Sequence, residues 1–213
     1  MSASRTEDIY RDFVIAHGLE RLALFELLSN RLGESATVLY PGCFVHITPS
    51  FFFQHVVYID RNDLAAAFFA EEKGVRRLID AHRRYRREPY VRFLAQDFTR
   101  ELPLRENSFD LLLALYAGGI SRSCVRYLKE GGLLVSNDHQ GDAREAAARG
   151  DLVLSAVITE KRGAVGIVER ELDGYLSPKL RPGKRGTAAS TKDYQRSADY
   201  YVFRKVRPKV APA

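Results

Sequence analysis

Cysteine is scarce in this chain of 213 residues: Cys43 and Cys124 are far apart and belong to no Cys-x-x-Cys or histidine-containing ligand pattern. This argues against a disulfide framework and against a structural zinc site, and we expect no metal. Long apolar runs are also missing, since none approaches the roughly 20 residues that cross a bilayer. The first residues include acids and lack the basic-then-apolar order of a secretory signal. We therefore expect reduced cysteines, no membrane partner and a cytoplasmic location.

Positive charge is sparse outside two segments, although the net charge is +6. Residues 73–92 hold eight basic and two acidic residues, residues 179–213 hold ten and two, and the rest of the chain has an acidic excess. Two interpretations stay open. The segments 73–92 and 179–209 could bind RNA or another anionic partner, or they could be solvated surface.

Apolar runs of strand length alternate with helical patterns, which is typical of a wound, mostly parallel α/β sheet with helices on both faces. A helix is expected over residues 5–33, and no internal repeat is visible. Antiparallel pairing is expected in the C-terminal part, with a long mobile loop over residues 177–198. We predict a single domain. The expected strands are residues 37–40, 56–59, 91–94, 111–115, 133–136, 152–160, 165–169 and 200–206, and the other expected helices are 62–72, 75–87, 121–129 and 142–148.

The ends of the first two expected strands are the most informative positions. The run "ATVLYPGC" breaks at Pro41-Gly42, and about twenty residues later a second apolar run ends on Asp60. This spacing is typical of α/β folds that bind nucleotides at their strand ends. A ligand site is therefore expected between these two ends.

Five sequence features in order carry a resemblance to a known family. They are "VLYPGC", the second strand ending on Asp60, "FLAQDF", "FDLLLALYAGG" and "LKEGGLLVSND". Over roughly residues 5–206 the chain resembles a class I S-adenosylmethionine-dependent methyltransferase. The resemblance implies a Rossmann-like, doubly wound sheet of seven strands with an antiparallel C-terminal hairpin, a cofactor-binding core over residues 36–150 and C-terminal antiparallel strands over residues 151–206.

The resemblance also implies a cofactor and its ligands. The small-molecule cofactor would be S-adenosylmethionine. Gly42 would let the backbone approach its methionine half, Asp60 would accept bonds from the ribose hydroxyls, and Asp97 would accept from the adenine amino group. The other implied cofactor-binding residues are Tyr40, Arg61, Gln96, Phe98 and Leu115.

Catalytic groups are harder to assign. His139 and Tyr116 are our candidates, because an imidazole or a phenol at a strand end could orient an acceptor. The sequence "LYAGG" replaces the [DNS]PP[YFW] motif of enzymes that methylate base nitrogens, which disfavours that chemistry. The acceptor itself is not predicted.

The glycine turn departs from the family pattern, because Tyr40 and Pro41 stand where an acid is usual and only Gly42 remains of the glycines. A second hypothesis follows from this departure: a methyltransferase-like binding protein without catalysis. A third, a dinucleotide-dependent oxidoreductase, is disfavoured because "YPGCFV" lacks the G-x-G-x-x-G turn that admits a pyrophosphate.

Overall fold

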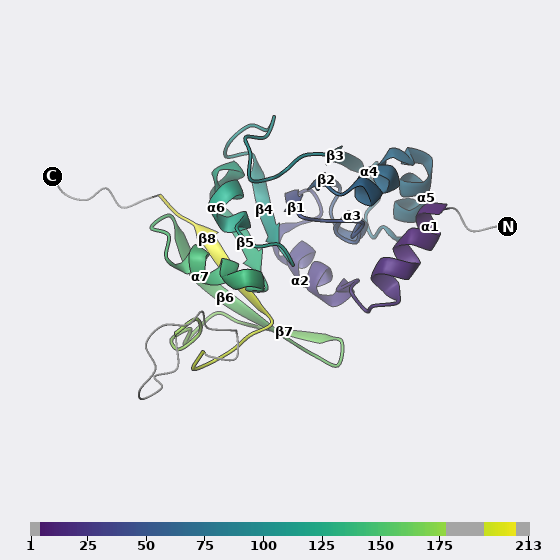
Figure 1. Cartoon of the computed structure of the whole chain (residues 1–213). Helices are drawn as coiled ribbons and strands as arrows, with labels where there is room; N and C mark the ends of the chain where they lie inside the picture. The colour runs from purple at the N-terminus through teal and green to yellow at the C-terminus, as the bar shows by residue number, and fades with distance from the viewer. Residues whose placement is uncertain (1–4, 178–193, 208–213) are drawn as a thin grey trace.

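One eight-stranded sheet forms the centre of the computed structural model, which describes residues 5–177 and 194–207 (Figure 1). The strand order is β3-β2-β1-β4-β5-β8-β6-β7. The first five strands along the chain are parallel, β8 is antiparallel to both β5 and β6, and β7 is antiparallel to β6. The strands are β1 (Thr37–Pro41), β2 (His55–Ile59), β3 (Tyr90–Leu94), β4 (Phe109–Ala114), β5 (Leu128–Ser136), β6 (Leu152–Lys161), β7 (Ala164–Val168) and β8 (Tyr200–Lys205).

The predicted α/β class with an antiparallel C-terminal hairpin is confirmed. The family resemblance implies seven strands, whereas the described sheet has eight, the number of strand-length runs expected from the sequence. The difference lies at the C-terminal end: β6 and β7 form a hairpin, and β8 then inserts between β5 and β6.

Helices cover both faces of the sheet, with α6 and α7 on one face and α1, α2, α3 and α5 on the other (Figure 1). Neighbouring strand residues alternate between the two cores: Tyr40 packs with the α1–α5 side and Leu39 with the α6–α7 side. Burial on both faces explains why the strands are near-continuous apolar runs. The helices are α1 (Arg5–Tyr10), η1 (Arg11–Ile15, a π-helix), α2 (Leu22–Leu32), α3 (Pro49–Phe52), α4 (Asp63–Ala70), α5 (Glu72–His82), α6 (Ile120–Cys124), η2 (Val125–Tyr127), η3 (His139–Gly141) and α7 (Asp142–Ala147).

The N-terminal helix expected over residues 5–33 is not continuous. It is interrupted between η1 and α2, where Gly18 has φ +63° and Arg21 has φ +54°. Left-handed backbone cannot continue a right-handed helix, so the chain turns there. The expected end at Gly33 is confirmed, with φ +84° at this C-cap residue. Two other expected helices also end early, α5 at His82 and α6 at Cys124.

Most of the predicted mobile loop, residues 178–193, lies outside the described residues. Its last part is described and is tied to the body. Tyr194 is buried, and the N–H of Arg196 donates to the carbonyl of Gly174 at 3.0 Å. No helix in the described residues is long and apolar enough to cross a membrane.

Candidate functional site

Gly42 lies directly after β1 in left-handed backbone, with φ +65°. Its N–H donates to the carbonyl of Ile59 at 2.7 Å, which joins the turn to the end of β2. A Cβ at this position would lie 2.6 Å from the Cβ of Ala117 in the loop after β4. Glycine is therefore required here on two counts, the sign of φ and the approach of Ala117.

Asp60 follows β2, as predicted, and is half-buried. One carboxylate oxygen accepts from the N–H of Phe44 at 2.7 Å, and the other accepts from the N–H of Asn62 at 2.9 Å. Phe44 itself has φ +49°. The carboxylate therefore holds the turn after β1 in place. Because a carboxylate offers about four acceptor positions, two remain for a ligand.

Asp97 follows β3 and closes a local turn. Its Oδ1 accepts from the N–H of Thr99 at 2.9 Å and from the Thr99 hydroxyl at 2.7 Å, and these bonds lower the pKa of the carboxyl. Arg61 approaches the other oxygen at 3.6 Å from a largely exposed position. Gln96 is exposed and Phe98 is half-buried beside Gly42. Asp60 and Asp97 thus end adjacent strands, as predicted.

Tyr40 points away from this group into the core on the α1–α5 side. Its buried hydroxyl lies 2.9 Å from Nδ1 of His46. Burial, together with the positive charge of Arg21, lowers the pKa of His46 to about 3. Burial also raises the pKa of Tyr40 above its usual range. We therefore assign Tyr40 and His46, both neutral, to the support of the turn after β1.

Tyr116 and His139 come together at the ends of β4 and β5, with ring centroids 5.9 Å apart in an edge-to-face arrangement. Tyr116 is 47% exposed with φ +63°, whereas the preceding Leu115 is fully buried. Arg21 lies over the Tyr116 ring at 4.4 Å and donates to the hydroxyl of Tyr200. Three elements distant in sequence therefore meet around one guanidinium.

Arg21 is the residue that sequence reasoning missed. Its Nε is buried and has no hydrogen-bond partner among the described residues, and no carboxylate there forms an ion pair with it. Because the half-buried guanidinium of Arg21 faces tyrosine side chains, it is suited to bind an anionic group of a ligand. No local sequence pattern predicts the position of Arg21, because an arginine whose backbone is in the left-handed region, with φ +54°, has no sequence signature.

Asp138 is not aimed at this cluster. It is buried, and its Oδ2 accepts from the hydroxyl of Tyr194 at 2.7 Å while its Oδ1 accepts from the N–H of Ala143 at 3.1 Å. The carboxylate of Asp138 is therefore not oriented toward His139, the next residue.

The acceptor groups at the strand ends suit the adenosine half of S-adenosylmethionine, because Asp60 and Asp97 retain acceptor positions. The loop after β4 packs closely on the glycine turn, with 2.6 Å between the Ala117 Cβ and the position that a Gly42 Cβ would occupy.

Some residues of the basic segments are engaged internally where they are described. Arg76 and Arg83 pair with Asp80, and Arg84 pairs with Glu26. Lys205 donates to the carbonyls of Val125 and Leu128 and to Asn107. Most of residues 179–209 lies outside the described residues.

No protein-family model matches the sequence, and no curated protein is similar enough to count as a relative. Several solved structures, in contrast, are similar to this chain. One is an S-adenosylmethionine-dependent methyltransferase, possible histamine N-methyltransferase, from Thermotoga maritima, at 13% identity and a TM-score of 0.50 over 94% of this chain and 96% of that one. The chain has the methyltransferase fold.

Two further structures give lower scores. The tRNA (m1A58) methyltransferase of Aquifex aeolicus matches at 12% identity and a TM-score of 0.48, over 88% of this chain and 69% of that one. The [4+2]-cyclase SpnF matches at 21% identity and a TM-score of 0.42, over 56% of this chain. The match spans 45% of SpnF, so this chain corresponds to less than half of that protein. At these identities the likeness concerns the methyltransferase fold alone.

Proposed function

We propose that the chain is an S-adenosylmethionine-dependent methyltransferase whose acceptor is undetermined. The observation that carries the proposal is the pair Asp60 and Asp97, two carboxylates at the ends of adjacent parallel strands of a methyltransferase fold, each with free acceptor positions. Ligands of open α/β sheets bind at this edge, beside the point where the strand order reverses. That point lies between β1 and β4 here.

Each residue then has a role set by its chemistry. The cofactor would supply an electrophilic methyl group. Asp60 accepts from the ribose hydroxyls, and Asp97 accepts from the adenine amino group. Tyr116 and His139, exposed and half-buried at the neighbouring strand ends, orient the acceptor, and Arg21 binds an anionic group on it. Proximity and alignment supply much of the rate of such transfers.

A second candidate is a binding protein of the same fold without catalysis. The contact between Gly42 and Ala117 favours it, because the space above the glycine turn is filled by the chain itself.

Calorimetric titration of S-adenosylmethionine and S-adenosylhomocysteine into the protein tests both candidates. The first predicts micromolar binding that weakens by about tenfold or more in Asp60→Asn, since about 1.4 kcal/mol is lost with the charged acceptor. Asp63→Asn, a nearby exposed carboxylate at the start of α4, is the matched control. Ala117→Gly is expected to tighten binding because it clears the space above Gly42.

The outcomes separate the candidates. Binding that responds to Asp60 but not to Asp63 supports the methyltransferase. Absence of binding by a folded wild-type protein and by Ala117→Gly contradicts it and favours the second candidate.

RNA or another anionic acceptor remains part of the proposal, through residues 73–92 and 179–209. Within the first segment, Arg86 and Arg87 form no ion pair among the described residues. Binding of an RNA should fall steeply with salt, and the slope should decrease in Arg86→Glu/Arg87→Glu. Salt-independent acceptor binding would instead indicate a small neutral molecule.

A further inference from the structure

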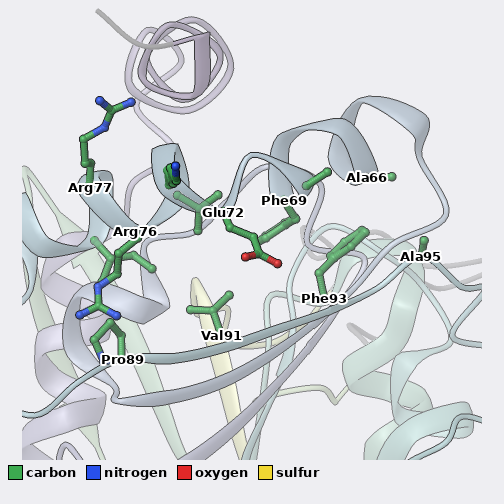
Figure 2. A pocket seen from close by; sticks show the side chains of 13 residues that line it. Ala66, Phe69, Glu72, Arg76, Arg77, Pro89, Val91, Phe93 and Ala95 are labelled. Atoms are coloured by element: carbon green, nitrogen blue, oxygen red, sulfur yellow. The ribbon is translucent and has the colours of Figure 1, made fainter.

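A cavity of about 970 Å³ lies between α4, α5 and β3 (Figure 2). None of the ten residues predicted for the site lines it. Its floor is the β3 side chains Val91 and Phe93, and the Phe69 ring stacks on Phe93 at 4.5 Å. The other apolar residues of the lining are Ala66, Ala70, Val75, Ile79, Pro89 and Ala95, and its charged residues are Glu72, Lys73, Arg76 and Arg77.

The same two floor residues form a free strand edge. β3 is the last strand on its side of the sheet and pairs only with β2 among the described residues. The N–H of Tyr90 donates to Gln54 and the carbonyl of Leu94 accepts from Asp60, so these residues turn their backbone groups inward. In a parallel strand the intervening residues point the other way. The N–H and C=O groups of Val91 and Phe93 therefore face outward, and no described residue bonds to them.

The rim charge indicates what would pair with this edge. Lys73 and Arg77 are exposed and form no ion pair with any described residue, whereas Arg76 pairs with Asp80 and Glu88. A second copy of the chain would bring another segment of eight basic and two acidic residues against this one. Like charges facing each other disfavour such a pairing, and an acidic partner is complementary.

We propose that the outer edge of β3 and the adjoining cavity bind an extended acidic peptide segment of another protein by strand addition. The peptide backbone pairs with Val91 and Phe93, and every second side chain of the peptide points to the face of the sheet that carries the cavity. The central side chains of this set are apolar and enter the cavity, and the outer ones are acidic and reach Lys73 and Arg77. This is the usual division of roles in strand addition, in which main-chain bonds give affinity and alternate pockets give specificity. An RNA would use neither the apolar floor nor the strand edge.

Glu72 limits the affinity of this surface. Its carboxylate points into the cavity beneath the helices (Figure 2). It would repel an acidic peptide, so its neutralisation should tighten binding. A ligand attracted through a carboxylate, such as a cationic one, would show the opposite response. The sign of the Glu72 effect therefore reports the charge of the partner.

The test uses the full chain and fluorescence anisotropy with labelled nine-residue peptides. Positions 1 and 9 are glutamate, positions 3, 5 and 7 are valine or phenylalanine, and the remaining positions are threonine, so that glutamates and apolar residues share one face of the strand. Two control series have lysine in place of glutamate, or N-methyl groups on the alternate backbone amides that would pair. Binding by the glutamate series alone is expected. Equal binding by the lysine or N-methyl series, or no binding by any series, would overturn the proposal.

Three variants refine the assignment. Val91→Pro removes an outward N–H, which an edge strand tolerates, and should weaken binding by about tenfold or more. Lys73→Glu/Arg77→Glu should also weaken it, with Lys161→Glu on the distant hairpin as the control. Glu72→Gln should tighten it. If Val91→Pro does not fold, the N-methyl peptides still decide whether backbone pairing occurs, and weaker binding to Glu72→Gln would contradict an acidic partner.

Discussion

Two edges of the same sheet differ in how far the chain satisfies its own groups. At the carboxyl ends of β1, β2 and β4, polar groups are tied to one another, and Ala117 fills the space above Gly42. At the outer edge of β3, a cavity of about 970 Å³ adjoins backbone groups and cations that no described residue pairs with. The positions richest in chemical groups are therefore not the positions with the most free space. Variants that disturb the packing at the strand ends should lower stability, whereas variants at the outer edge of β3 should leave stability almost unchanged.

Gly42→Ala should give the largest loss of stability. The new Cβ would meet the Cβ of Ala117 at 2.6 Å in backbone of φ +65°, so strain and overpacking combine to about 3 kcal/mol. Urea unfolding followed by circular dichroism measures the loss. Gly150→Ala, whose Cβ would meet nothing within 4 Å, is the control. Equal stability of the two variants would show that the space between Gly42 and Ala117 can accommodate a methyl group.

The change of stability with pH should be the second largest effect. His46 is neutral when folded, with a pKa of about 3, against 6.5 for a free histidine. Below pH 6.5 the unfolded chain binds a proton that the folded chain does not, so stability falls as the pH falls toward 3. The loss between pH 7 and pH 4.5 is on the order of 2 kcal/mol.

Urea unfolding at these two pH values measures the loss. His46→Gln should be less stable at pH 7 and should lose less on acidification than the wild type. His17→Gln, at an exposed position, should leave the pH dependence unchanged. A His46→Gln curve parallel to that of the wild type would contradict a buried neutral imidazole.

Tyr194→Phe should cost about 1–3 kcal/mol, because the buried Oδ2 of Asp138 loses the hydroxyl that donates to it. Thermal unfolding measures this change. Tyr175→Phe removes a hydroxyl that accepts a 3.3 Å bond from exposed Arg196, and should have a much smaller effect. If Tyr194→Phe leaves the thermal stability unchanged, water readily replaces the hydroxyl.

Lys73→Gln and Arg77→Gln should change stability by less than about 0.5 kcal/mol each, because neither side chain is paired among the described residues. Lys205→Gln is the contrast, since its ammonium donates to two carbonyls and Asn107. Chemical unfolding compares the three variants. A large loss from Lys73→Gln would place that residue in the folded framework and remove it from a binding rim.

The sequence predicted the strands well because β1, β2 and β4 are buried on both faces and read as continuous apolar runs. It also placed Asp60 and Asp97 at strand ends, since a polar residue after an apolar run marks the end of the run. Gly18 is a local signal for the break before α2, but the second left-handed residue of that break, Arg21, has no such signal. The contact of Gly42 with Ala117 depends on how two loops distant in sequence pack, and no local pattern encodes it.

The position of β8 has a consequence for folding during synthesis. Residues 200–205 lie between β5 and β6, so the strand translated last occupies an interior place in the sheet. Until it emerges from the ribosome, β5 and the β6–β7 hairpin have no common neighbour, and both expose an unpaired edge. A nascent chain arrested before residue 200 should therefore contain two separate sheet fragments that are prone to aggregate. The sheet can close only after residues 200–205 have left the ribosome.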